Sequence, residues 1–356
     1  MSKAAELAAL IGSQSALSNR NLIINGSASV NQRGDVTGKT ATTYGGPDRW
    51  ELGISGLGTH SISQSSTAPD GFSNSYKVDC TTADASPAAG DFLVVTHKIE
   101  AQNLQHLQYG SSGAQKLTLS FYVRSNKTGT YVTELLADDP SRIICATYTI
   151  SSADTWEFKK ITFDGDTAGT GINDDNGVGL FVNFWLGAGS TYTSGTLATT
   201  WQAFDAADRV AGQTVNLADS TSNEWYITGV QMELGEQETP FEHEPYGVTL
   251  QKAQRYYEDS GGGNQYSFSG SASGFGGNTY FDSADFKVTK RAVPTITITD
   301  TSGNSGRMTV FQGATGYDNQ QVFFETTRVN AFSPRTGGGR TDAGLGRAIW
   351  SADAEL

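Results

Sequence analysis

The sequence is dominated by short segments in which apolar residues occupy every second position. Between Leu117 and Val123, and again between Leu180 and Leu186, this alternation is unbroken. Consecutive side chains of a β-strand point to opposite faces, so a period of two predicts strands with one buried face. No helix of ordinary length interrupts the pattern between residues 22 and 247, which disfavours a parallel α/β sheet. The pattern therefore predicts an all-β chain, built as a β-sandwich or a barrel.

The first residues differ from the rest. Residues 2–18 are rich in Ala and Leu, and Leu7, Leu10 and Ile11 have the spacing of one helix face. We predict a short amphipathic helix here, within an N-terminal segment that covers residues 1–21. Because so short a helix is marginal alone, it needs a partner surface. That surface is its own domain, a copy of itself or another protein.

One further boundary divides the rest of the 356 residues. The run 235–247, which we call the strap, contains two prolines and several charges, and three glycines follow at 261–263. Short strand-like segments resume after them. We therefore predict a large β domain over 22–247 and a small C-terminal β domain over 248–356.

Composition excludes several functions. The chain carries 24 Lys and Arg against 37 Asp and Glu, a net charge of −13, with no basic cluster. It is a poor candidate for nucleic-acid binding, which needs grouped cations. No apolar run reaches 18 residues, so we expect no membrane insertion, and the N-terminus has no secretory signal pattern. Cys80 and Cys145 make no metal motif and are expected to be buried thiols, although a disulfide between them is an alternative.

Several segments occur together and in a recognisable order. They are NRNLIINGSASVNQRGD (19–35), DRW (48–50), LTLSFYVRS (117–125), GLFVNFWLGAGSTYTSG (179–195), WYITGVQMELGEQETPFEHEPYG (225–247), KAQRYY (252–257) and KRAVPTITI (290–298). In this order the chain resembles virion structural proteins of tailed bacteriophages that carry a carbohydrate-binding-module-like jelly roll. Ala253 stands where the family usually has Cys. The resemblance spans nearly the whole chain, and the segment 225–247 is its most specific part.

This resemblance implies a function. The expected fold is a jelly-roll β-sandwich, preceded by the short helix and followed by the smaller β domain. The expected role is a virion protein, assembled in the host cytoplasm, that forms a tail fibre or appendage and recognises a host-surface glycan. A homotrimer in contact with other virion proteins is also implied, with Leu7, Leu10 and Ile11 as candidates for attachment or oligomerisation. A head-decoration or adaptor protein with no ligand, and a polysaccharide depolymerase, are the alternatives.

The candidate glycan site comes from the non-core positions of three strands. These positions hold two aromatic residues and several hydrogen-bonding groups, as sugar-binding surfaces do. If the three strands are neighbours, one surface contains Tyr122, Arg124, Asn183, Trp185, Gln231 and Glu233. The alternative is that this face packs against a sister subunit, the N-terminal helix or a loop. A glycan receptor should leave the face of Trp185 open, whereas an adaptor should bury it.

The sequence contains no recognisable catalytic or metal-binding motif, so we expect no enzyme and no cofactor. The four histidines lack metal spacing, and each is expected at the surface or at an edge. The acidic pairs Asp138/Asp139 and Asp174/Asp175 fall in turn-like sequence and read as solvated turns. A structural Ca²⁺ in the loop 171–177 is the alternative, because carboxylate and carbonyl oxygens suit that ion.

Overall fold

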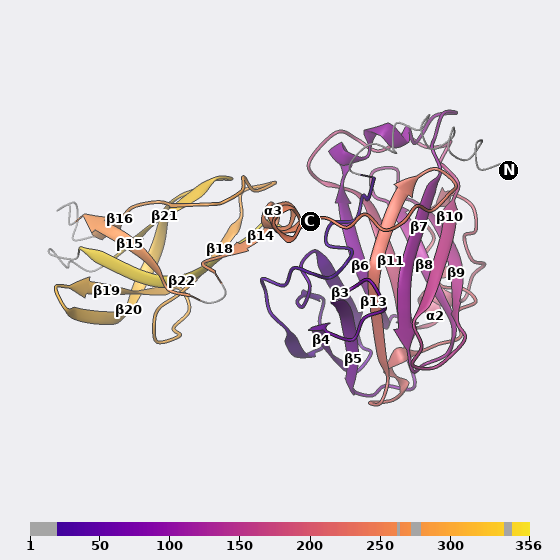
Figure 1. Ribbon diagram of the computed structural model, residues 1–356, viewed down its shortest axis with the longest axis horizontal. Coiled ribbons are helices and arrows are strands. Elements are labelled where there is room, and N and C mark those ends of the chain that lie inside the picture. Colours follow the sequence, from indigo (N-terminus) through magenta and orange to yellow (C-terminus); the bar gives the residue numbers. More distant parts are fainter. Residues whose placement is uncertain (1–19, 262–263, 272–278, 338–343) are drawn as a thin grey trace. The chain divides into compact units, whose positions relative to one another are not determined.

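The computed structural model describes residues 20–261, 264–271, 279–337 and 344–356. The chain divides into two compact units, one running to Tyr246 together with Leu356, and one spanning Gly247–Glu355. Both units are built from β-strands, which Figure 1 labels in chain order. The candidate anchor residues Leu7, Leu10 and Ile11 lie outside the described residues.

The first unit is a jelly-roll β-sandwich of two antiparallel sheets. Among the described residues, six strands form one sheet in the order β1 (Val36–Lys39), β4 (Thr59–Ser65), β5 (Ser75–Thr82), β13 (Glu224–Leu234), β7 (Leu117–Ser125) and β10 (Glu157–Phe163). Seven form the other, in the order β12 (Gln202–Ala203), β9 (Arg142–Ile150), β8 (Gly129–Ala137), β11 (Val178–Ala188), β6 (Phe92–Glu100), β3 (Trp50–Ser55) and β2 (Thr43–Tyr44). The chain crosses between the sheets repeatedly, as from β5 to β6, from β6 to β7 and from β7 to β8. The expected fold class is therefore confirmed.

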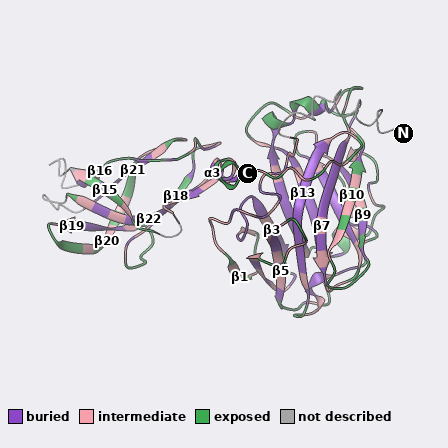
Figure 2. Ribbon diagram, in the orientation of Figure 1, coloured by how far each residue is buried: buried purple, intermediate pink, exposed green. Residues whose placement is uncertain are grey.

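The alternating segments fill the space between the two sheets. Leu119 and Phe121 from β7 lie in one apolar core with Val182 and Phe184 from β11, and all four are fully buried. Figure 2 shows buried residues along β7 and β13. The predicted inward face of each strand is thus confirmed.

Short helical turns connect the strands. They are η2 (Ala101–Asn103), η3 (Gln105–Leu107), α2 (Ser190–Thr193), η4 (Ala206–Asp208) and η5 (Leu217–Asp219). Two of these turns, η2 and η3, follow one another between β6 and β7. The described part of the chain contains no helix long and apolar enough to cross a membrane.

Two histidines depart from the expectation of a surface position. His60 and His97 are both fully buried. Both lie in strands whose alternation turns them inward, and His97 Nε2 accepts a hydrogen bond from the backbone N–H of Ile24 at 3.3 Å. The prediction failed because the alternation of a strand, and not the polarity of the side chain, decides which face a residue occupies.

The second unit begins at Gly247, within the helix α3 (Tyr246–Gln254), and continues as a ring of strands. The strands of the ring follow the order β22 (Leu345–Asp353), β15 (Tyr266–Ser271), β16 (Thr279–Phe281), β21 (Ala331–Thr336), β20 (Thr315–Thr327) and β19 (Arg307–Gln312). Neighbouring strands pair antiparallel, and the ring closes because β19 also pairs with β22. Within the described part of this unit, three short strands attach to the ring, namely β14 (Tyr257–Asp259), β17 (Ala284–Asp285) and β18 (Thr295–Thr299).

This ring has a core of its own, with Phe268, Phe332 and Trp350 among its buried members. Beside the core, the buried ammonium of Lys290 lies 2.6 Å from Glu258. The second unit is therefore a small β-barrel.

Candidate functional site

The structure separates the strands that were expected to share one outer face. β13 pairs with β7 in the six-stranded sheet, whereas β11 pairs with β6 and β8 in the seven-stranded sheet. Asn183 and Trp185 therefore lie on the opposite side of the sandwich from Tyr122 and Gln231. The prediction of one six-residue surface is wrong, because alternation sets the face of a strand but not the sheet that it joins.

Gln231 and Glu233 lie beneath the strap. Glu233 Oε1 accepts the backbone N–H of Thr239 at 2.8 Å, and Oε2 accepts its hydroxyl at 2.7 Å. Gln231 Oε1 accepts the backbone N–H of Glu242 at 2.8 Å. Both side chains are buried, so they hold the strap on the sheet and are not presented to a ligand.

Tyr122 and Arg124 are only partly buried, on the outer face of the six-stranded sheet. The ring of Tyr122 lies 5.0 Å from Phe158 and 5.6 Å from Phe72, with interplanar angles of 54° and 56°. Arg124 pairs with Asp154 at 3.0 Å. The rings of Phe72, Tyr122 and Phe158 thus pack against one another as a cluster on this face.

A cleft of about 220 Å³ lies on the outer face of the seven-stranded sheet. Asn183 and Trp185 belong to its lining, together with the partly exposed rings of Phe92, Phe181 and Tyr192. Phe181, Asn183 and Trp185 occupy every second position of β11, so the three side chains lie on the same face of the strand. Tyr192 comes from α2, which follows β11 directly.

A chain of buried hydrogen bonds forms the floor of the cleft. The Thr96 hydroxyl donates to Asn183 Oδ1 at 2.7 Å, and Asn183 Nδ2 donates to Glu134 Oε2 at 2.9 Å. Trp185 Nε1 donates to the same carboxylate oxygen at 3.0 Å. Buried polar groups that are all hydrogen-bonded hold a fixed geometry, so this floor is rigid.

Arg209 covers Trp185. Its Nε and Nη2 donate to the two carboxylate oxygens of Glu134 at 2.7 and 2.8 Å, and its guanidinium lies 4.7 Å from the centre of the Trp185 ring. Trp185 is consequently only 1% exposed. The indole was expected to be open in a glycan receptor, but its own chain buries it, so Trp185 supports the cleft wall and offers no stacking surface.

The opposite side of the cleft is formed by β3 and β6. Lys98 Nζ lies 3.1 Å from Glu51 Oε2 and 5.8 Å from the centre of the Phe181 ring. Gly53 lies two residues after Glu51, and a Cβ at this position would come within 2.8 Å of Val94 Cγ1. Glycine in the middle of a strand often marks a close approach of other groups, and here it keeps the floor of the cleft low.

Sequence reasoning missed most of the residues that line this cleft. Phe181 had a signal, since it shares its face with Asn183 and Trp185. No sequence pattern pointed to Lys98 or Glu51, because the two residues come together only through the pairing of β3 with β6. Arg209 lies just after η4 in a segment without periodicity, so no pattern could have assigned it.

The arrangement favours binding over hydrolysis. Glycoside hydrolysis requires two carboxyl groups that act as acid and as base or nucleophile. The two carboxylates at this cleft, Glu51 and Glu134, are each held in an ion pair with a cation.

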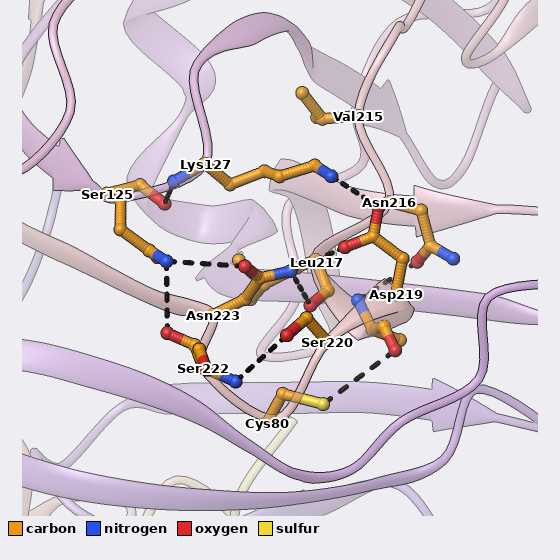
Figure 3. A network of polar contacts seen from close by, with 12 residues as sticks. Cys80, Ser125, Lys127, Val215, Asn216, Leu217, Asp219, Ser220, Ser222 and Asn223 are labelled. Carbon is orange, nitrogen blue, oxygen red and sulfur yellow. Dashed lines mark hydrogen bonds and ion pairs between the residues drawn. The ribbon is translucent and has the colours of Figure 1, made fainter.

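A second polar network, drawn in Figure 3, fixes the loop before β13. Asn223 Nδ2 donates to Asp219 Oδ1 at 2.6 Å, and Asp219 in turn pairs with Lys127. Cys80 Sγ lies 3.8 Å from the carbonyl oxygen of Ala218 at the edge of this network. Its polar groups are paired with one another, so the network stabilises the loop.

Both cysteines are buried and unpaired, as expected.

The carboxylates of the acidic loop 171–177 and of the neighbouring Asp139 make local hydrogen bonds. Asp139 accepts the backbone N–H and the side-chain amide of Asn173 at 3.0 and 2.6 Å, and Asp175 Oδ1 accepts the N–H of Gly177 at 2.7 Å. These bonds hold the loop in place beside the turn at Asp139. Within the described ranges, no three His, Cys, Asp or Glu side chains are grouped to hold a metal ion.

Comparisons with known proteins give structural likeness only. No family model and no curated protein matches the sequence. The enzymatically active domain of tailspike protein 4 from bacteriophage CBA120 is 14% identical with a TM-score of 0.34, and the match covers 60% of this chain and 21% of that one. The chain thus spans about a fifth of that tailspike domain.

Two further structures match along nearly their whole length. A protein from Bacteroides thetaiotaomicron VPI-5482, described as a "putative sugar binding protein", is 12% identical with a TM-score of 0.35. The match covers 61% of this chain and 100% of that one. A family 16 carbohydrate-binding module is 11% identical with a TM-score of 0.29, covering 60% of this chain and 99% of that one. The β-sandwich itself is established by its strand pairings.

Proposed function

We propose that this protein is a structural component of a tailed-phage virion, a tail fibre or appendage, and that it recognises a host-surface glycan through the cleft on the seven-stranded sheet. The virion role is supported by the resemblance of the segments 117–125 and 225–247 to phage virion proteins. The binding role is supported by one observation above all. Partly exposed aromatic rings and fixed polar groups surround the same open cleft.

The chemistry of a sugar explains why this combination matters. Aromatic faces pack on the C–H groups of a pyranose, and precisely oriented donors and acceptors satisfy its hydroxyls. Phe92, Phe181 and Tyr192 supply the apolar contacts. Arg209 and Lys98 supply donors that are already held in position by Glu134 and Glu51, so little ordering is required on binding.

A glycan array probed with the full chain tests the binding role. We expect wild type to bind, and Phe181→Ala or Tyr192→Ala to weaken that binding at least about tenfold. Phe158→Ala is the matched control, since Phe158 is 48% exposed but belongs to the six-stranded sheet; it should bind as wild type does. A wild type that binds no glycan, or an F181A variant that binds equally well, contradicts the proposal. Trp185→Ala is a poor test, because a buried indole also stabilises the fold.

The virion role has separate tests. We propose a homotrimer in contact with other virion proteins, assembled in the host cytoplasm and carried on the particle. Mass photometry of the purified full chain should give three times the mass of one chain. Mass spectrometry and immunogold labelling of purified particles should find the protein at the tail, and its absence from particles would contradict the role.

A head-decoration or adaptor protein without a ligand is the second candidate. The burial of Trp185 favours it, because an adaptor was expected to bury this indole. The two candidates differ in outcome: the adaptor binds no glycan and is located on the head or between virion proteins.

A further inference from the structure

Each cation of the cleft is paired with a carboxylate of the protein. Arg209 is paired with Glu134 through two hydrogen bonds of 2.7 and 2.8 Å, and Lys98 is paired with Glu51 at 3.1 Å. Arg209 and Lys98 are the cationic residues of the cleft lining within the described part of the chain, and Glu51 is the anionic one. With Glu134 included, the charges sum to zero.

We propose that the cleft selects an uncharged sugar residue and discriminates against its acidic counterpart, a uronate or a sialate. This inference rests on the proposed glycan-binding function and names the class of glycan. A carboxylate that enters a site must exchange its hydration for charge-assisted hydrogen bonds. Here both cations already make such bonds to Glu134 and Glu51.

The carboxylates of the protein add a repulsive contribution. A sugar carboxylate placed against Lys98 or Arg209 also approaches the carboxylate that each cation holds, and the juxtaposition of like charges disfavours a partner. The chain as a whole carries a net charge of −13, which acts in the same direction at low ionic strength. The hydroxyls of a neutral sugar meet no such repulsion, and they can share the remaining lone pairs of Glu51.

The size of the cleft limits what it can hold. Its volume of about 220 Å³ is below the range of about 300–1,000 Å³ that is typical of sites for drug-sized ligands. One sugar residue, such as a terminal pyranose, therefore fits better than an extended chain. The absence of a side chain at Gly53 contributes to this space, because a Cβ there would meet Val94.

Glu51 offers a test by gain of function. Its side chain is 15% exposed at the cleft edge, so Glu51→Gln removes one negative charge with little loss of packing. Lys98 also donates to the carbonyl oxygen of Leu356 at 2.7 Å. In E51Q it keeps that bond but loses its Glu51 partner, so its charge can pair with a sugar carboxylate. The matched control is Glu157→Gln, which removes the same charge from β10 in the other sheet.

The experiment measures Kd for matched pairs of glycans that end in glucose or glucuronate, and in galactose or galacturonate, at physiological ionic strength. For wild type and E157Q we expect the neutral member to bind at least about tenfold more tightly. For E51Q we expect this ratio to fall below about threefold, mainly through tighter binding of the uronate. Circular dichroism confirms that each variant is folded.

The outcomes separate the two proposals. Equal or tighter binding of the uronates by wild type overturns the neutral preference and leaves the glycan-binding function in place. A neutral preference that E51Q does not reduce also overturns the inference, because charge pairing would not be its cause. Binding of no glycan at all overturns the proposed function, and the inference with it.

Discussion

The guanidinium of Arg209 lies 4.7 Å from the centre of the Trp185 ring. Both side chains donate to Glu134, which is fully buried in β8. Arg209 stacks on the indole while its own N–H groups donate to the carboxylate. This arrangement fixes all three side chains. The wall of the cleft is therefore held in place by the protein's own side chains.

Removal of Glu134 should be costly for the fold. We expect Glu134→Ala to lower the free energy of unfolding by about 3 kcal/mol, because it leaves the charge of Arg209 and two donors without their acceptor. Denaturant unfolding followed by tryptophan fluorescence measures the change. The control is Asp154→Asn: Asp154 is 55% exposed and pairs with Arg124, so we expect a loss below about 1 kcal/mol. Equal losses in the two variants would show that Glu134 has no special structural role.

Much of the fold could be predicted from the sequence, because the pattern that identifies a strand lies within the strand itself. The alternation of Leu117 to Val123 and of Leu180 to Leu186 is enough to identify the buried face of each strand. The candidate site could be predicted only in part, since it depends on which strands become neighbours. Asn183 and Trp185 were assigned to the correct face of β11, but the partners expected for them on β7 and β13 belong to the other sheet.

The strap shows a second limit of sequence reasoning. Gln231 and Glu233 alternate with core residues as sugar-binding residues would, and the sequence does not reveal that Thr239 and Glu242 return to cover them. Long-range hydrogen bonds of this kind leave no periodic signal. Arg209 was missed for the same reason.

Gly229 lies at an irregular position of β13 and should not tolerate a side chain. Its φ is +61°, and a Cβ there would lie 2.6 Å from Phe72 and 3.1 Å from Tyr122. We expect Gly229→Ala to reduce the free energy of unfolding by about 2–3 kcal/mol, from backbone strain together with the steric clash. Gly38→Ala is the matched control, with a φ of +62° and no atom within 4 Å. It carries the strain alone, about 1 kcal/mol. If denaturant unfolding gave equal losses for the two variants, the packing of Phe72 and Tyr122 against β13 would be irrelevant.

Calcium should not stabilise the acidic loop 171–177. The carboxylates of Asp139 and Asp175 already accept hydrogen bonds from Asn173 and Gly177. A ligand that binds only the folded state raises its stability according to its concentration and affinity. We therefore expect the same Tm in EDTA and in millimolar CaCl₂, measured by scanning calorimetry. A Tm that rises with calcium concentration, and that Asp175→Asn abolishes, would contradict this expectation.

His60 makes stability depend on pH. Both ring nitrogens are buried, and within the described residues neither has a hydrogen-bond partner. Its strand neighbours are Cys80 on β5 and Lys39 on β1. Burial lowers the pKa of His60 from 6.5 to about 4, because the protonated ring would lose its hydration without compensation.

Acidification should therefore destabilise the first unit before its carboxylates are protonated. Between pH 6.5 and about 4 the unfolded chain binds a proton at His60 that the folded chain does not. The free energy of unfolding must then rise with pH across this window and fall as the pH is lowered. The contribution of His60 amounts to about 3 kcal/mol at the acid end. Burial also lowers the pKa of His97, which acts in the same direction.

Urea unfolding at a series of pH values measures this effect. The slope of the free energy of unfolding against pH should be shallower for His60→Leu than for wild type, whatever the stability of the variant at neutral pH. Identical slopes would mean that His60 is protonated in the folded protein as easily as in the unfolded chain.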